Sequence, residues 1–178
     1  MCTRRYIPTY YANNIYEVDI AFYEAENITT LLIDLDNTLD SFKAKTPSEK
    51  ARSLIENLHQ YGYNIIIISN NKGNRVKTYA DALDLAYLGN ARKPFAYKIK
   101  KILAENDIDK EKTLLIGDQL MTDVRAAKRA GIRVMLTEKL VKEDQWTTHI
   151  NRLFDRPIRR KLKRKNLLND WREVYEQN

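Results

Sequence analysis

The chain has 178 residues, of which 43% are hydrophobic and 31% charged, and it carries a net charge of +7 and a single cysteine, Cys2. This length and composition fit one globular domain and exclude a disordered chain, a fibre and a disulfide-stabilised fold. Because the N-terminus lacks the apolar run of a signal peptide, and no apolar run approaches the roughly 20 residues that span a bilayer, we expect a cytoplasmic protein.

Five short runs are apolar on both faces and alternate with longer stretches of helical periodicity. Such runs are typical of buried parallel strands, and they cover residues 29–34, 64–69, 85–89, 113–117 and 132–137. Strands of this kind, separated by helices, predict an α/β fold: a doubly wound, Rossmann-like three-layer sandwich with a parallel sheet of about five strands. Ligands bind such sheets at the carboxyl ends of the strands.

The helix after the first strand has clear signals at both ends. Thr46 and Glu49 are spaced as a capping box, Pro47 suits the first helical position, and Gly62 can supply the C-terminal cap. These signals predict a helix over residues 47–61.

Two further helices are predicted nearer the C-terminus. One runs from about Asp123 and ends at Gly131. The other opens at Pro94, and its apolar residues share one face: Phe95, Ile99, Ile102 and Leu103.

Two carboxylates follow the first predicted strand. Asp34 and Asp36 are spaced so that both turn to one side of an extended chain, and Thr38 follows them. An acidic turn after a strand explains one aspartate better than two. Because carboxylates this close repel each other, the pair indicates a bound cation.

Other polar residues follow the later strands, and each taken alone has a structural explanation. Ser69 and Asn70 can cap a helix, Lys93 can be a solvated surface lysine, and Asp123 suits the first turn of a helix. Asp118 has no such explanation. Because the parallel sheet would gather all of them at one edge, we interpret the set as a site with metal ligands, a hydroxyl donor and a cation for a phosphoryl group.

This set resembles the haloacid dehalogenase-like (HAD) phosphatases, whose four motifs match DLDNTL (34–39), Ser69, Lys93 and GDQLMTD (117–123), in the family's order. The YqeG-like, subfamily IIIA branch is similar over about residues 15–165. Six stretches carry that likeness: IYEVDI, LIDLDNTL, ISNN, ARKP, IGDQLMTDV and the tail RLFDRPIRRKL. Relatives of this branch include phosphatidylglycerophosphate phosphatases.

The resemblance implies a phosphatase that works through an aspartyl-phosphate. Asp34 would attack phosphorus, and Asp36 would be the general acid and then the general base. Mg²⁺ would be held by Asp34, the backbone carbonyl of Asp36 and Asp118, with Asp123 fixing a water ligand or Lys93. The phosphate would be held by backbone N–H groups of the DLDNT loop and by four side chains: Thr38, Ser69, Asn70 and Lys93.

Substrate choice in this family usually rests on cap domains, for which the intervals from Asp34 to Ser69 and from Ser69 to Lys93 leave no room. We therefore expect residues 1–149 to form a capless core with an open site, suited to large or surface-borne phosphates. Phosphatidylglycerophosphate is the leading candidate. Leu35 and Thr38 stand where the mitochondrial branch typically carries Lys and Cys, so the likeness is greater to bacterial members.

Residues 150–178 are expected to form a basic helical extension packed on or next to the core, with Asp155 as its helix cap and Pro157 in the second position. Against the single acid Asp155, residues 151–165 contain eight basic side chains: Arg152, Arg156, Arg159, Arg160, Lys161, Lys163, Arg164 and Lys165. Such a helix can lie on an anionic membrane surface, which would make the protein peripheral.

Two other functions fit parts of the sequence. A receiver domain also uses an acidic Mg²⁺ pocket, but its phospho-acceptor lies on a later central strand, whereas the third strand here ends in Gly89 and Asn90. A nucleic-acid- or ribosome-associated binding protein would use the basic tail and show little or no turnover. The absence of aromatic residues between Phe154 and Trp171 slightly favours a membrane over nucleic acid as the tail's partner.

Overall fold

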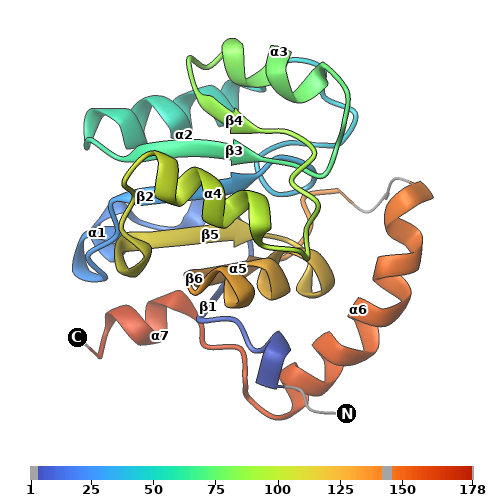
Figure 1. Ribbon diagram of the computed structural model, residues 1–178. Coiled ribbons are helices and arrows are strands. Elements are labelled where there is room, and N and C mark those ends of the chain that lie inside the picture. Colours follow the sequence, from blue (N-terminus) through green and yellow to red (C-terminus); the bar gives the residue numbers. More distant parts are fainter. Residues whose placement is uncertain (1–3, 142–145, 178) are drawn as a thin grey trace.

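The computed structural model of the protein describes residues 4–141 and 146–177, the side chains of 146–154 excepted. Its centre is a parallel six-stranded sheet in the order β1-β6-β5-β2-β3-β4 (Figure 1). The strands are β1 (Tyr10–Ala12), β2 (Thr30–Asp34), β3 (Asn64–Ile68), β4 (Ala86–Leu88), β5 (Thr113–Gly117) and β6 (Arg133–Thr137). The predicted α/β fold is confirmed, with one more strand than expected, because the short β1 was not predicted.

Helices lie between the strands and on both faces of the sheet. The α-helices are α1 (Ile20–Ala25), α2 (Glu49–Gln60), α3 (Arg75–Asp81), α4 (Tyr97–Glu105), α5 (Arg125–Ala130), α6 (Trp146–Arg164) and α7 (Trp171–Tyr175). Shorter helical turns are η1 (Arg4–Tyr6), η2 (Ile15–Glu17), η3 (Lys110–Lys112) and the π-helical turn η4 (Leu120–Val124). Within the described ranges, no helix is both long enough and apolar enough to cross a membrane.

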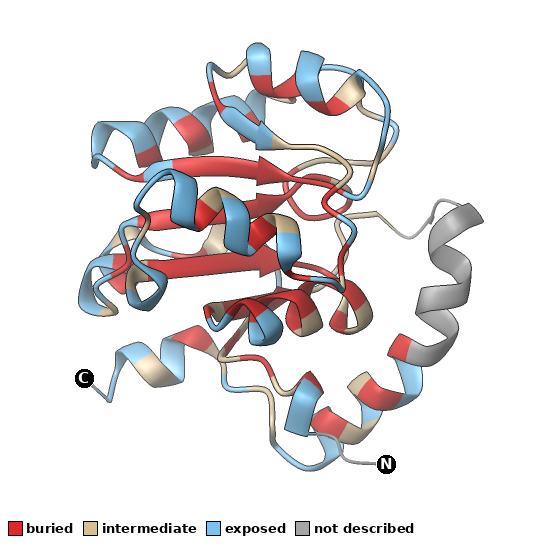
Figure 2. Cartoon of the chain, in the orientation of Figure 1, coloured by how far each residue is buried: buried red, intermediate tan, exposed pale blue. Residues whose placement is uncertain are grey.

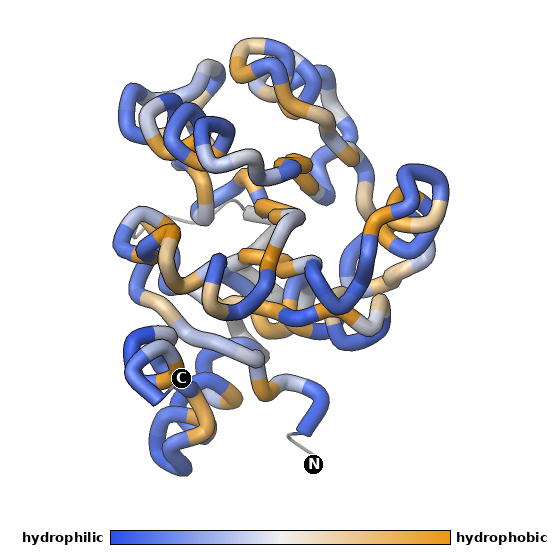
Figure 3. Tube along the Cα trace, turned by 90° about the vertical axis from the view of Figure 1, so that its left-hand side faces the viewer, coloured by the Kyte–Doolittle hydropathy of each residue, from blue (hydrophilic) through white to orange (hydrophobic). Residues whose placement is uncertain are grey.

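The two faces of the sheet form two separate hydrophobic clusters, because successive side chains of a strand point to opposite faces. Leu31 and Ile33 of β2 pack in one cluster with residues of α1, α2, α3 and α7. Leu32 packs in the other with residues of α4, α5 and α6. Most strands are buried, whereas the edge strand β4 is largely exposed and the helices expose one side (Figure 2). Hydrophilic residues alternate with hydrophobic ones along the outer turns (Figure 3). This is the predicted three-layer sandwich.

The start of α2 differs from the prediction. Ser48, and not Thr46, is the N-cap residue: its hydroxyl accepts the N–H of Ala51 at 3.2 Å. Pro47 therefore precedes the helix. The predicted end is close to the observed one, and Gly62 adopts a positive φ of 78° just beyond it, which a glycine does without strain.

The segment after Lys93 also differs. Pro94 lies inside a turn in which Phe95 N–H donates to the Arg92 carbonyl at 2.9 Å, and α4 begins only at Tyr97. Phe95 is 67% exposed and does not belong to the buried face, whereas Ile99 is buried as expected.

The third predicted helix is α5 preceded by the π-helical turn η4. Gly131, with φ 79°, ends this helix in the left-handed conformation, as the sequence predicted. The predicted start of the tail helix was wrong. Asp155 and Pro157 lie inside α6, and Asp155 is buried instead of capping a helix.

Candidate active site

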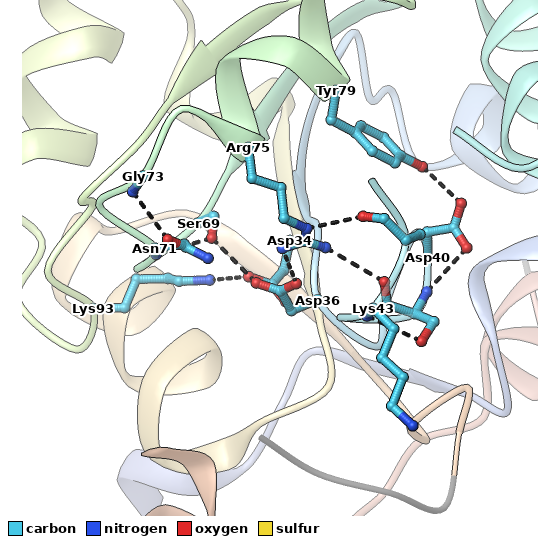
Figure 4. Close-up of polar contacts among 12 residues, drawn as sticks. Asp34, Asp36, Asp40, Lys43, Ser69, Asn71, Gly73, Arg75, Tyr79 and Lys93 are labelled. Atoms are coloured by element: carbon cyan, nitrogen blue, oxygen red, sulfur yellow. Dashed lines mark hydrogen bonds and ion pairs between the residues drawn. The ribbon is translucent and has the colours of Figure 1, made fainter. Parts of the chain in front are cut away.

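The end of three neighbouring strands brings the predicted residues together. In the sheet, β2 lies between β5 and β3, so Asp34 at the end of β2 lies between the residues that follow the other two. Those residues are Asp118 after β5 and Ser69 after β3. Lys93 reaches the same place from the segment between β4 and α4 (Figure 4).

A buried cluster of three carboxylates forms the centre of the site. One carboxylate oxygen from each of Asp34, Asp118 and Asp123 lies within 4.8 Å of the others. The buried ammonium of Lys93 donates to Asp34 and, at 2.6 Å, to Asp123. Three carboxylates and one ammonium leave an excess of two negative charges. That excess matches a divalent cation, and carboxylate oxygens are the ligands that Mg²⁺ prefers.

The pKa values in this cluster are shifted in the direction that an excess of negative charge produces. Burial raises the pKa of the Asp34 carboxyl well above its ordinary value, although the Lys93 ammonium opposes this. Further carboxylates raise it too: Asp123, Asp118 and Asp36. Burial disfavours charged Lys93, but Asp123 and Asp34 outweigh it and raise the pKa of Lys93 above its ordinary value. A cation among the carboxylates would relieve this repulsion.

The absence of a side chain at Gly117 allows Asp123 to approach the end of β5. A Cβ atom at position 117 would lie 2.6 Å from the Cβ atom of Asp123, closer than such atoms come. The second oxygen of the Asp123 carboxylate accepts the backbone N–H of Gln119 at 3.0 Å and the Thr122 hydroxyl at 3.3 Å. Both carboxylate oxygens of Asp123 therefore accept hydrogen bonds, one from Lys93 and the other from Gln119 and Thr122.

The loop after β2 is tightly folded around the first motif. Asn37 has a positive φ of 65°, which asparagine tolerates better than most residues, and its N–H donates to the Asp40 carbonyl at 2.7 Å. The Asp40 carboxylate in turn accepts the Ser48 N–H at 2.8 Å. Thr38 is 1% exposed, and its hydroxyl has no hydrogen-bond partner among the described residues.

Asp36 is not one of the three clustered carboxylates, and it contacts Arg75 of α3. The guanidinium donates to Asp36 at 2.6 Å and to the Ala44 carbonyl at 2.9 Å, and the Ser69 hydroxyl donates to the other oxygen of Asp36 at 3.4 Å (Figure 4). The sequence does not single out Arg75. Arg75 lies several residues after the second predicted strand and belongs to no motif. The only sequence feature that could have pointed to it is its basic side chain at the start of a helix.

Asn70 holds the backbone of Lys93. Its carbonyl oxygen accepts the Lys93 N–H at 2.7 Å, and its amide group donates to the Lys93 carbonyl at 2.9 Å. The adjacent Asn71 N–H donates to the Ser69 hydroxyl at 3.0 Å. The observed contacts of Asn70 position Lys93; its predicted contact with phosphate stays a prediction.

Comparisons with known proteins agree with this geometry. A family model described as HAD-hydrolase-like matches residues 90–156, which include Lys93 and the GDQLMTD motif. The chain is 29% identical over 173 residues to "Probable phosphatase YqeG" of Bacillus subtilis (strain 168), covering 97% of this chain and 100% of that protein. It is 26% identical to "Glyceraldehyde 3-phosphate phosphatase" of Pyrococcus abyssi (strain GE5 / Orsay), covering 64% of this chain and 50% of that one.

Solved structures with the same fold include two bacterial proteins. One, from Vibrio cholerae, is described as a candidate 3-deoxy-D-manno-octulosonate 8-phosphate phosphatase; it matches with a TM-score of 0.54 and 19% identity over 89% of this chain and 97% of that one. The other is an uncharacterized protein from Listeria monocytogenes serotype 4b. It matches with a TM-score of 0.52 and 18% identity, over 66% of this chain and 85% of that one. At these identities the likeness establishes the fold.

Proposed function

We propose that this chain, which is similar to haloacid dehalogenase-like hydrolases, is a Mg²⁺-dependent phosphatase in which Asp34 takes the phosphoryl group from substrate. The observation that carries this proposal is the buried cluster of Asp34, Asp118 and Asp123 with the Lys93 ammonium against it. A nucleophilic carboxylate, cation ligands and a fixed positive charge are the parts that phosphoryl transfer requires, since this chemistry depends mainly on positioning and charge stabilisation.

In the first step, an oxygen of Asp34 attacks phosphorus, a bond forms between them, and the bond from phosphorus to the leaving oxygen breaks. In the second step, water attacks the same phosphorus and releases phosphate and free Asp34. Splitting one displacement into two replaces a difficult hydrolysis with two easier ones. In both steps Lys93 and the Ser69 hydroxyl would bind the equatorial oxygens, and the buried Thr38 hydroxyl would be a further donor.

Asp36 moves the protons. It donates a proton to the leaving oxygen in the first step and takes one from the attacking water in the second. Both of its carboxylate oxygens are engaged in the structure, one by Arg75 and one by Ser69. Delivery of the proton therefore requires the Asp36 side chain to turn from Arg75 toward the leaving group.

Mg²⁺ fits the donor set, because hard carboxylate oxygens of Asp34, Asp118 and Asp123 lie close to one another. Asp34 and Asp118 would hold it with the backbone carbonyl of Asp36, while Asp123 keeps Lys93 in place. When bound, the cation would neutralise negative charge on the transferring group.

The substrate is proposed to be a bulky or surface-borne phosphate, for which a lipid phosphate such as phosphatidylglycerophosphate is the leading candidate. Support comes from the continuous stretch between Asp34 and Lys93, which holds only α2, β3, α3 and β4 and their loops, with no inserted domain over the site. The name of the Pyrococcus relative refers to a small phosphate, so a substrate panel should include both kinds.

The test is phosphate release from a chromogenic monoester, measured with and without Mg²⁺ for wild-type protein and Asp34→Asn. The amide keeps the shape of the side chain and removes its nucleophilicity, so we expect Asp34→Asn to be folded and inactive. The reference variant is Asp19→Asn, which makes the same chemical change at an exposed aspartate. Wild-type activity in folded Asp34→Asn would show that the mechanism is wrong.

A further inference from the structure

Helix α6 lies against the loop that carries two of the three clustered carboxylates. The Asp155 carboxylate of α6 accepts the backbone N–H of Met121 at 3.0 Å. The Arg159 guanidinium, one helical turn later, donates to the backbone carbonyl of Asp118 at 2.7 Å. Figure 1 shows α6 on the side of the molecule toward which the strands point. The tail is thus connected by hydrogen bonds to residues 118–123.

Arg159 also joins this loop to the end of the neighbouring strand. It donates to the carbonyl of Thr137, the last residue of β6, at 3.3 and 3.4 Å, and pairs with the Glu138 carboxylate at 3.0 Å. Glu138 is itself fixed, because it accepts from Lys163 and from the Tyr11 hydroxyl, each at 2.8 Å. One guanidinium therefore ties the ends of β5 and β6 to α6.

Both side chains are shielded from water, so these contacts are not the weak kind that surface charges make. Asp155 is 2% exposed, and the side chain of Arg159 is 13% exposed. On the same side of α6, Ile158 and Leu162 are buried in the cluster that contains Leu120 of η4. Apolar packing thus fixes the helix, and the two polar side chains fix the loop relative to it.

We infer that Asp155 and Arg159 are positioning residues of the site: they hold the backbone of residues 118–123 so that Asp118 and Asp123 meet the metal and Lys93. This inference rests on the proposed function for its catalytic readout. Groups that orient metal ligands without touching the metal commonly change metal affinity or activity about 10- to 100-fold when removed. The sequence predicts other roles for both residues, a helix cap for Asp155 and membrane contact for Arg159.

The experiment compares Arg159→Gln and Asp155→Ala with wild-type protein. Asp155→Asn is the conservative variant, since its amide oxygen can still accept the Met121 N–H. Lys161→Gln on the same helix is the control for loss of charge. Three quantities are measured: hydrogen exchange of the amides of residues 118–124, the rise of Tm caused by Mg²⁺, and kcat and KM for the chromogenic monoester.

We expect Arg159→Gln and Asp155→Ala to be folded, with faster amide exchange in this loop and a smaller Mg²⁺-induced rise of Tm. Their kcat should fall about tenfold with little change in KM, because the metal ligands and not the substrate contacts are misplaced. Asp155→Asn should stay near wild type, as should Lys161→Gln.

Wild-type exchange, Mg²⁺ response and kcat in both variants would overturn the inference. A lower Tm with unchanged kcat and Mg²⁺ response would also overturn it, because the contacts would then be structural only. If Asp155→Ala does not fold, the inference is tested by the amide exchange, Mg²⁺ response and kcat of Arg159→Gln alone. Should wild-type protein release no phosphate, the proposed function fails, and amide exchange with the Mg²⁺ response still decides whether α6 positions the loop.

Discussion

Gly117 determines how closely Asp123 can approach the end of β5. We predict that Gly117→Ala displaces Asp123, because the added methyl group would lie 2.6 Å from its Cβ atom. Such overpacking typically costs about 1–3 kcal/mol. Displacement breaks the contact of Asp123 with Lys93, so phosphatase activity should fall by more than the loss of stability explains. Thermal unfolding and kcat measured on the same preparation separate the two effects.

Gly89, which follows the end of β4, provides the control for this prediction. A Cβ atom there would have its nearest neighbour at 3.7 Å, an ordinary contact. Gly89→Ala should therefore leave kcat near wild type. Equal kcat in Gly117→Ala and Gly89→Ala would contradict the role given to Gly117.

The residues that the sequence predicted best are those that follow strands. Asp34, Ser69 and Asp118 could be placed in one site because parallel strands end at one edge. Arg75, Asp155 and Arg159 could not, because each lies in a helix and reaches the site through a long side chain or through the backbone of another segment. Nothing in the local sequence distinguishes them from solvated charges, so their roles depend on how α3 and α6 pack.

At the scale of elements, α6 has two sides with different chemistry. Arg159 and Lys163 contact the core through Glu138, so they are engaged by the protein itself and not free for the membrane contact that the sequence predicts. Four other basic residues are exposed, three on the helix and one directly after its end: Arg156, Arg160, Arg164 and Lys165. Three of these are spaced by four positions, which places them on one side of the helix. We propose that this side contacts an anionic membrane surface.

This proposal predicts salt-sensitive flotation of the protein with vesicles that contain anionic lipid. Each basic residue near such a surface contributes about 1 kcal/mol. Changing Arg156, Arg160, Arg164 and Lys165 to Gln should therefore abolish flotation without changing kcat for a soluble monoester. The charge-matched control changes four exposed lysines elsewhere: Lys45, Lys100, Lys101 and Lys110. Equal absence of wild-type protein from anionic and neutral vesicles, or binding to a competing duplex instead, would contradict the proposal.

The strands were easier to predict than the helix ends. A run that is apolar on both faces has few alternatives to a buried strand, and β2, β3, β4, β5 and β6 begin or end within one residue of the predicted runs. Helix starts were less certain, since Thr46 and Ser48 are both acceptable caps and only tertiary contacts choose between them. The three-residue β1 was missed because its sequence is too short to have a period.

At the scale of the whole molecule, three buried carboxylates in one cluster destabilise the metal-free fold. We predict that Mg²⁺ raises the Tm of wild-type protein, because it binds only the native arrangement of the ligands. At 100 times Kd the gain is about 2.7 kcal/mol, and each kcal/mol corresponds to about 2–4 °C for a chain of this size.

Asp118→Asn should lose most of this rise, whereas Asp19→Asn, a change at an exposed aspartate, should keep it. Differential scanning calorimetry at several Mg²⁺ concentrations measures the rise of Tm in both variants. No rise in wild-type protein at millimolar Mg²⁺, or an equal rise in Asp118→Asn, would contradict the proposed ligands.

The resemblance to haloacid dehalogenase-like phosphatases and to their YqeG-like branch is confirmed by the comparisons. The resemblance is specific because the four motifs occur in the family's order, each at the end of a predicted strand or just before the next helix. The relation to phosphatidylglycerophosphate phosphatases stays a prediction. Substrate recognition depends on residues around an open site, and those have no fixed spacing in the sequence.

Trapping the covalent intermediate tests the central claim most directly. Wild-type protein turning over a phosphomonoester with Mg²⁺ is quenched with borohydride, which reduces an acyl phosphate to the corresponding alcohol, and the peptides are analysed by mass spectrometry. The account predicts homoserine at position 34 and at no other aspartate, and none when substrate is omitted. Steady phosphate release with unmodified Asp34, or with the label on another residue, would contradict it.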